Sequence, residues 1–212
     1  MDRLEIIRIR DLQNQYFLTG TTLDVGHRIS ALKTLRAGIR RYEDAICRAL
    51  KADLGKGSYE SFMCEIGMVY DEISHMIRNV RHFAKEKTVR TPLAQFRSRS
   101  FVKPSPLGTV LIMSPWNYPF LLTMEPLIDA IAAGNTAMVK PSAYSPETGS
   151  VIQKIIKVCF PEEYVAVVTG GRKENQYLLD EKFDFIFFTG SKSVGQLVMQ
   201  KSAEHLTPFA LE

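Results

Sequence analysis

The stretch GTVLIMSPWNYPFLLTMEPLIDAIAAGNTAMVK, residues 108–140, decides the fold of this chain. It opens with a continuous apolar run at 109–113, continues as a helical pattern over 119–133 and closes with a second apolar run at 136–140. Short apolar runs without polar alternation are typical of strands that are buried on both faces. Two such strands joined by one helix predict a parallel pair, because a helix is the usual crossover between parallel strands.

The same alternation continues toward the C-terminus. Helical patterns lie at 147–159, 173–181 and 191–204. Apolar runs lie between and after them, at 164–168, at 183–188 and from Pro208 onward. We therefore expect five parallel strands with helices on both faces of one sheet. Because crossovers between parallel strands are right-handed, the leading architecture is an α/β fold with a Rossmann-like, doubly wound parallel sheet.

The residues before this region have a different pattern. Residues 1–87 carry apolar side chains at helical spacing, such as Ile29 and Leu32, and predict N-terminal helices packed on the sheet. Residues 88–107 contain three prolines and alternate basic with apolar residues, which predicts a projecting, extended arm. The expected organisation is a helical part, this arm, and a sheet part over 108–212.

The composition limits the class of protein. The chain has 212 residues, of which 45% are apolar and 24% charged, enough for one substantial core. Basic residues gather between Arg78 and Lys103, but no aromatic residues are regularly interleaved, so a solvated arm is favoured over a nucleic-acid surface. Three widely spaced cysteines argue against a disulfide framework or a metal site and indicate a reducing compartment. Without a signal-peptide pattern or a membrane-spanning stretch, we expect a cytoplasmic protein with no nucleic-acid or membrane partner.

The turn after one predicted strand has features of a phosphate site. FFTGSKSVGQ, residues 187–196, passes through Thr189, Gly190 and Ser191 into a helix, and a helix N-terminus offers free N–H groups to a phosphate. The usual dinucleotide fingerprint needs a glycine where this chain has Lys192. On this stretch alone, a plain turn and a nucleotide site are about equally well supported.

Two polar side chains follow the strands of the opening stretch. Asn117 lies between Pro115 and Pro119, which restrict the backbone, so its amide is a candidate donor to a developing oxyanion. The alternative is that Asn117 caps a helix. Lys140 ends the second apolar run, where an amine can reach ribose hydroxyls or a phosphate. The alternative is an ordinary surface lysine.

Several stretches together resemble the aldehyde dehydrogenase superfamily in order and spacing, most closely its class 3-like branch. They are PLGTVLIMSPWNYPF, DAIAAGNTAMVKPSAYSPET, FFTGSKSVGQ, HLTPFALE and, in the N-terminal helices, ALKADLGK and EIGMVYDEI. The resemblance covers essentially the whole chain. It implies that residues 1–212 are the NAD(P)-binding domain, and that the catalytic domain with its nucleophilic cysteine lies beyond Glu212. It also implies a full-length parent that oxidises a small-molecule aldehyde to a carboxylic acid and forms a homo-oligomer, a dimer or a tetramer.

The resemblance also assigns roles to residues at the strand ends. Asn117 would hold the oxyanion, and Glu212 would activate the water that hydrolyses the acyl intermediate. Lys140 matches the family's lysine at the adenosine ribose, and Gly190 with Ser191 match the turn beside the pyrophosphate. The cofactor, NAD or NADP, is expected to contact residues of four strand-end loops: Ser114, Pro115, Trp116, Lys140, Ser142, Ala143, Gly170, Thr189, Gly190, Ser191 and Val194.

One position departs from this branch of the family. Ala143 stands where a glutamate usually chelates the ribose hydroxyls, so we expect NADP to be accepted at least as well as NAD. Two other interpretations stay open. One is a stand-alone nucleotide-binding or regulatory module. The other is a relative that makes or consumes acyl-CoA or acyl phosphate, against which Glu212 argues because hydrolytic members need that base.

Overall fold

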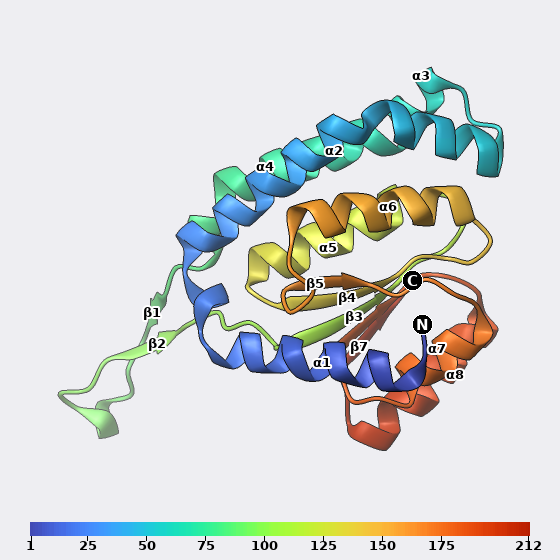
Figure 1. Ribbon diagram of the computed structural model, residues 1–212. Helices are drawn as coiled ribbons and strands as arrows, with labels where there is room; N and C mark the ends of the chain where they lie inside the picture. Colours follow the sequence, from blue (N-terminus) through green and yellow to red (C-terminus); the bar gives the residue numbers. More distant parts are fainter.

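A computed structural model describes residues 1–212, and its centre is one five-stranded parallel sheet (Figure 1). The strands lie in the order β5-β4-β3-β6-β7. Their bounds are β3 Thr109–Met113, β4 Thr136–Lys140, β5 Val165–Val167, β6 Phe185–Phe188 and β7 Phe209–Leu211. The first strand of the sheet, β3, lies in its middle. The strands β4 and β5 follow on one side of it, and β6 and β7 on the other. The predicted doubly wound α/β fold is therefore confirmed.

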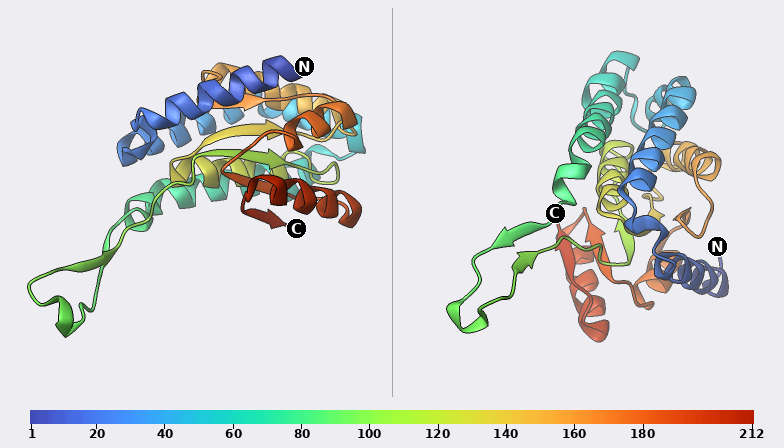
Figure 2. Two further views of the ribbon diagram at one scale, coloured as in Figure 1. Left: turned by 90° about the horizontal axis from the view of Figure 1, so that it is seen from below. Right: turned by 90° about the vertical axis from the view of Figure 1, so that its left-hand side faces the viewer.

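Helices cover both faces of this sheet (Figures 1 and 2). One face carries α5 (Leu121–Ala133) and α6 (Pro146–Cys159), and the other carries α1 (Arg3–Leu18), α7 (Arg172–Leu179) and α8 (Lys192–His205). The predicted ends of α7 and α8 differ from these bounds by one or two residues, as is usual where helix ends fray.

A second layer of helices packs on α5 and α6 (Figure 1). It comprises η1 (Thr21–Leu23), α2 (Val25–Leu54), α3 (Ser58–Ser61), the π-helical turn η2 (Phe62–Ile66) and α4 (Gly67–Phe83). The prediction of N-terminal helices on the sheet needs one refinement. Among the N-terminal helices, α1 lies against the strands β3 and β4, whereas α2 and α4 pack mainly on the layer formed by α5 and α6.

The side chains of β3 show why the sheet must be covered on both faces. Val110 and Ile112 belong to the core shared with α2, α4, α5 and α6, and Leu111 and Met113 belong to the core shared with α1, α7 and α8. All four are at most 4% exposed. Burying a side chain of this size contributes about 1.5–3 kcal/mol, so the strand is stabilised from two directions.

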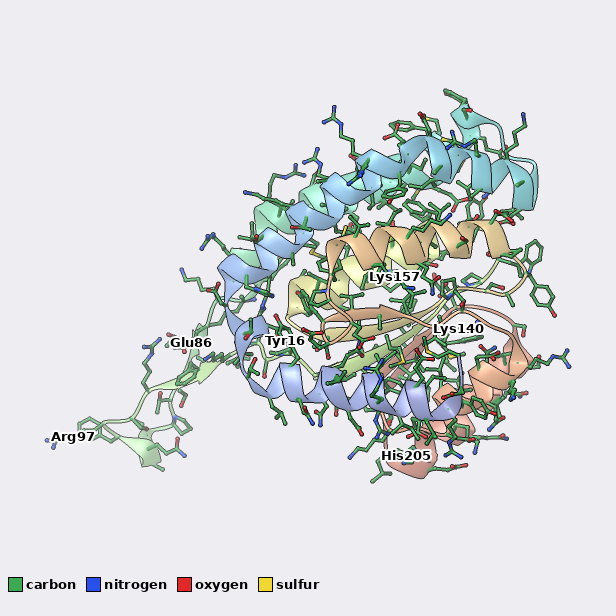
Figure 3. The ribbon with its side chains drawn as sticks, in the orientation of Figure 1. Tyr16, Glu86, Arg97, Lys140, Lys157 and His205 are labelled. Atoms are coloured by element: carbon green, nitrogen blue, oxygen red, sulfur yellow. The ribbon has the colours of Figure 1, made fainter.

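The residues between α4 and β3 form the predicted arm (Figure 2). It contains the antiparallel strands β1 (Lys87–Val89) and β2 (Ser100–Val102), with the short helix η3 (Leu93–Gln95) near its tip. Figure 3 shows Arg97 at this tip, far from the sheet. Leu93 and Phe96 are 90% and 81% exposed, so the arm carries apolar side chains that the rest of the chain leaves uncovered.

No helix of the structure combines the length and the apolar character that are needed to cross a membrane.

Candidate functional site

A cleft of about 790 Å³ opens at the carboxyl ends of β3 and β6. These two strands are neighbours, but the connections that leave them run to opposite sides of the sheet. Ligands of doubly wound sheets bind at this switch point. All but one of the candidate site residues from the sequence line this cleft. They are Ser114, Pro115, Trp116, Asn117, Lys140, Ser142, Ala143, Thr189, Gly190, Ser191, Val194 and Glu212.

The exception is Gly170, which lies beside the cleft rather than in its wall. Its backbone has φ +141°, and an added Cβ would lie 2.4 Å from the carboxylate of Glu174. That carboxylate accepts a hydrogen bond of 2.7 Å from the N–H of Gly171, which does line the cleft. Gly170 therefore allows the loop to fold closely over the start of α7.

The loop after β3 is held by hydrogen bonds to α5. The hydroxyl of Thr123 donates to the carbonyl oxygen of Pro119 (2.5 Å) and lies 2.6 Å from the hydroxyl of Ser114. Asn117 lines the cleft, and its side chain makes no hydrogen bond within the chain. The interpretation of Asn117 as a helix cap is wrong, because Phe120 is the N-cap of α5 and no side chain of the loop caps that helix.

Lys140 is buried at the end of β4, as Figure 3 shows, and only 3% of it is exposed. The interpretation as a surface lysine is therefore wrong. Its amine donates a hydrogen bond of 2.8 Å to the carbonyl oxygen of Pro141. Burial lowers the pKa of Lys140 to about 8, and the charge of Glu174 opposes that shift. The amine can therefore change its charge near neutral pH.

The turn from β6 into α8 exposes backbone N–H groups to the cleft. Ser191 is the N-cap of α8, and its side chain makes no capping hydrogen bond, so the N–H groups of the first turn have no partner from the cap. An added Cβ at Gly190 would lie 2.6 Å from the ring of Phe188. A larger residue would therefore displace the turn. The helix N-terminus carries a partial positive charge that favours an anion.

Glu212 directly follows β7 and lies beside this turn. Its N–H donates to the carbonyl oxygen of Phe188 (3.0 Å), and its own carbonyl accepts from the N–H of Gly190 (3.1 Å). Its carboxylate accepts a hydrogen bond of 3.3 Å from the hydroxyl of Thr189. Glu212 also lines a second hollow of about 360 Å³, between α5 and the half-buried face of β6. The carboxylate thus sits at the border of the two hollows.

Sequence reasoning missed several residues of the cleft wall. Arg172 and Asn175 come from α7, and Tyr144 and Ser193 come from the loop after β4 and the first turn of α8. The candidates lie directly after the strands or at the start of α8, whereas the first turn of α7 also faces the switch point. None of Cys47, Cys64 and Cys159 lines the cleft, and all three are free thiols.

Comparisons with known proteins agree with this geometry. Residues 11–212 match the aldehyde dehydrogenase family. The chain is 44% identical over 197 residues to 4,4'-diaponeurosporen-aldehyde dehydrogenase of Staphylococcus aureus, a match that covers 93% of this chain and 43% of the relative. It is 38% identical over 209 residues to aldehyde dehydrogenase family 3 member A2 of Pongo abelii, covering 99% of this chain and 42% of that protein. The chain therefore spans less than half the length of these curated relatives.

Solved structures that resemble this chain are also aldehyde dehydrogenases. A substrate-bound structure of AldH from Staphylococcus aureus matches with a TM-score of 0.96 and 42% identity, covering 98% of this chain and 45% of that one. A betaine aldehyde dehydrogenase of the same organism, solved with NAD+, shares the fold at 22% identity and a TM-score of 0.87. The family match extends over nearly the whole chain, and the chain belongs to the aldehyde dehydrogenase family.

Proposed function

We propose that the cleft binds NAD or NADP, and that this chain is the cofactor-binding portion of an enzyme that oxidises an aldehyde to a carboxylic acid. One observation supports this most strongly. This chain belongs to the aldehyde dehydrogenase family, and one cleft at the switch point of its sheet holds both a helix N-terminus and a buried lysine amine. The organisation into helices (1–87), arm (88–107) and sheet (108–212), a homo-oligomeric parent and a cytoplasmic location belong to the same proposal.

The residues present fit a nicotinamide dinucleotide. The N–H groups at the start of α8, beside Gly190 and Ser191, would bind the pyrophosphate. Lys140 and Ser142 would bind the ribose that is attached to adenine. Arg172, which lines the same cleft, adds a second cation for a phosphate on that ribose.

Two residues of the cleft have the chemistry that oxidation of an aldehyde requires. When bound, the nicotinamide ring accepts a hydride from the substrate. The amide of Asn117 would donate a hydrogen bond to the oxyanion that develops on the substrate carbonyl. The carboxylate of Glu212 would take a proton from the hydrolytic water, which favours an acid product over an acyl-CoA or acyl phosphate product.

The charge of Lys140 makes the proposed binding of NADP dependent on pH. Below the pKa of about 8 the amine is a cation that attracts the 2′-phosphate, and above this pKa it is neutral. NADP affinity should therefore fall by about 1–2 kcal/mol as the pH rises through this value, because one charge-assisted contact is lost. NAD has no phosphate at this position, so its affinity should change less. Quenching of Trp116, the single tryptophan of the chain, measures both dissociation constants.

The matched control is Lys140→Met, which keeps the apolar part of the side chain and removes the titrating amine. In this variant the affinities for NADP and NAD should follow the same course with pH. Native profiles that are already parallel would exclude contact between Lys140 and the 2′-phosphate. Absence of saturable binding of either dinucleotide at any pH would exclude the proposed function itself.

A further inference from the structure

A buried ion pair lies behind the loop that carries Asn117. The amine of Lys56 is 2.6 Å from one carboxylate oxygen of Glu65, and the two side chains are only 9% and 0% exposed. Neither residue lines the cleft. A buried ion pair loses its hydration and often gives no more stability than a well-packed apolar pair would. The other contacts of these two side chains therefore indicate what the pair does.

Both members of the pair bind the backbone of the loop. The amine of Lys56 donates a hydrogen bond of 2.9 Å to the carbonyl oxygen of Asn117 and lies 4.0 Å from the ring centroid of Tyr118. The second carboxylate oxygen of Glu65 accepts from the N–H groups of Phe120 (2.8 Å) and Leu121 (3.1 Å). A single ion pair thus holds the segment 117–121 at both ends.

The local structure places each partner where it is needed. Gly55 ends α2 in a left-handed conformation (φ +71°), which turns the chain so that Lys56 points back under the loop. Glu65 lies in the π-helical turn η2, and such turns frequently occur near functional sites. Because α5 has no side-chain cap of its own, Glu65 supplies the negative charge that a helix N-terminus favours.

We propose that Lys56 and Glu65 are positioning residues, which fix the peptide of Asn117 so that its side-chain amide is presented to the cleft. The consequence for catalysis rests on the proposed role of Asn117 at the oxyanion. The carbonyl of Asn117 and the N–H of Tyr118 share one planar peptide group. Releasing that carbonyl from Lys56 frees this group to rotate, and the Cα atom of Asn117, which carries the side chain, then loses its anchor on that side.

Two variants separate positioning from stability. Lys56→Met removes the bond to Asn117 and leaves the Glu65 carboxylate buried without its partner, so both the loop and the fold lose support. Lys56→Met combined with Glu65→Gln removes the unpaired charge and keeps an oxygen that can accept from Phe120 and Leu121. The double variant should therefore recover unfolding temperature while the tether to Asn117 stays absent.

A distant ion pair provides the matched control. Arg10 and Glu181 are also 2.6 Å apart, the Glu181 side chain is only 9% exposed, and neither residue touches the loop. Arg10→Met therefore removes the nearer of two cations from a carboxylate that is nearly as buried, and Arg3 remains 3.2 Å from the other oxygen of Glu181. The measurements are ¹⁵N relaxation of the Asn117 and Tyr118 backbone N–H groups and the midpoint of thermal unfolding. The N–H of Asn135, which donates a hydrogen bond of 2.9 Å to the carbonyl oxygen of Ala130, serves as the internal reference.

In the native chain, both loop N–H groups should have order parameters near the ~0.85 of rigid backbone. In Lys56→Met and in the double variant they should fall below about 0.6, the range of flexible backbone. They should stay at the native value in Arg10→Met, even though that variant unfolds at a lower temperature.

Native order parameters in the double variant would overturn the proposal, because the pair would then be structural only. Equal loosening of the loop in Arg10→Met would also overturn it. Should Lys56→Met fail to fold, the double variant decides alone. A native chain that binds no reduced nicotinamide would contradict the proposed function, whereas the order parameters would still decide the positioning role.

Discussion

The 212-residue chain by itself should oxidise no aldehyde, whichever nicotinamide cofactor is supplied. In the proposed reaction, a nucleophile must lie within bonding reach of the carbonyl that Asn117 would hold. None of Cys47, Cys64 and Cys159 lines the cleft, and burial raises the pKa of both the Cys47 and the Cys159 thiol, which disfavours a reactive thiolate. The assay is absorbance of reduced nicotinamide with a panel of aliphatic and aromatic aldehydes.

The positive control is the same chain joined after Glu212 to the remaining part of the staphylococcal relative that is 44% identical. By the proposed function, this fusion should turn over aldehyde, because it adds the remaining part of a full-length relative that is named as an aldehyde dehydrogenase. Turnover by the chain alone that persists when all three cysteines are replaced by serine would contradict the prediction. It would show that the cleft is complete without a further domain.

The variant Ala143→Glu should reverse the preference for the two cofactors. Ala143 lines the cleft together with Lys140 and Arg172, so a 2′-phosphate there would meet two cations, and Glu174 is the carboxylate whose charge acts on Lys140. A glutamate would accept hydrogen bonds from both ribose hydroxyls of NAD and would repel the phosphate of NADP. We expect the native chain to bind NADP at least as tightly as NAD, and the variant to shift the ratio of dissociation constants by about 1–2 kcal/mol toward NAD.

Ala143→Gln is the control, since glutamine has nearly the same volume as glutamate and no charge. It should shift the ratio less, because only the repulsion of the phosphate is missing. If glutamine and glutamate change the ratio equally, the effect is steric. A strong native preference for NAD that Ala143→Glu leaves unchanged would show that Lys140 and Ser142 fix the ribose without help from position 143.

The sheet could be predicted because its signal is local. Each strand of the sheet lies within or close to one apolar run, and each crossover helix lies between two runs, so the order along the chain already limits the topology. The cleft residues followed from the same rule, since they come directly after strand ends. Arg172 and Asn175 were missed because they belong to the first turn of α7, beyond the loop that follows β5.

The contacts behind the cleft could not be predicted in this way. Lys56 and Asn117 are separated by 61 positions, and nothing in the helical pattern of the N-terminal part shows which polar residue faces inward. Lys140 resembled any other lysine until burial at the end of β4 was visible. The role of Asn117 was ambiguous for a similar reason, because the cap of α5 is supplied by Glu65 from a distant segment.

The most direct test of the nicotinamide site is energy transfer from Trp116 to NADPH in this chain. Trp116 is the single tryptophan, lines the cleft and is 53% exposed, so a reduced nicotinamide bound there lies within reach of its emission. Titration with NADPH should give sensitised nicotinamide fluorescence that saturates. Ser191→Tyr, which fills the cleft at the start of α8, should abolish it, and Ser98→Tyr on the exposed arm should not. Transfer that never saturates, or that survives in Ser191→Tyr, would contradict a cofactor site at the switch point of the sheet.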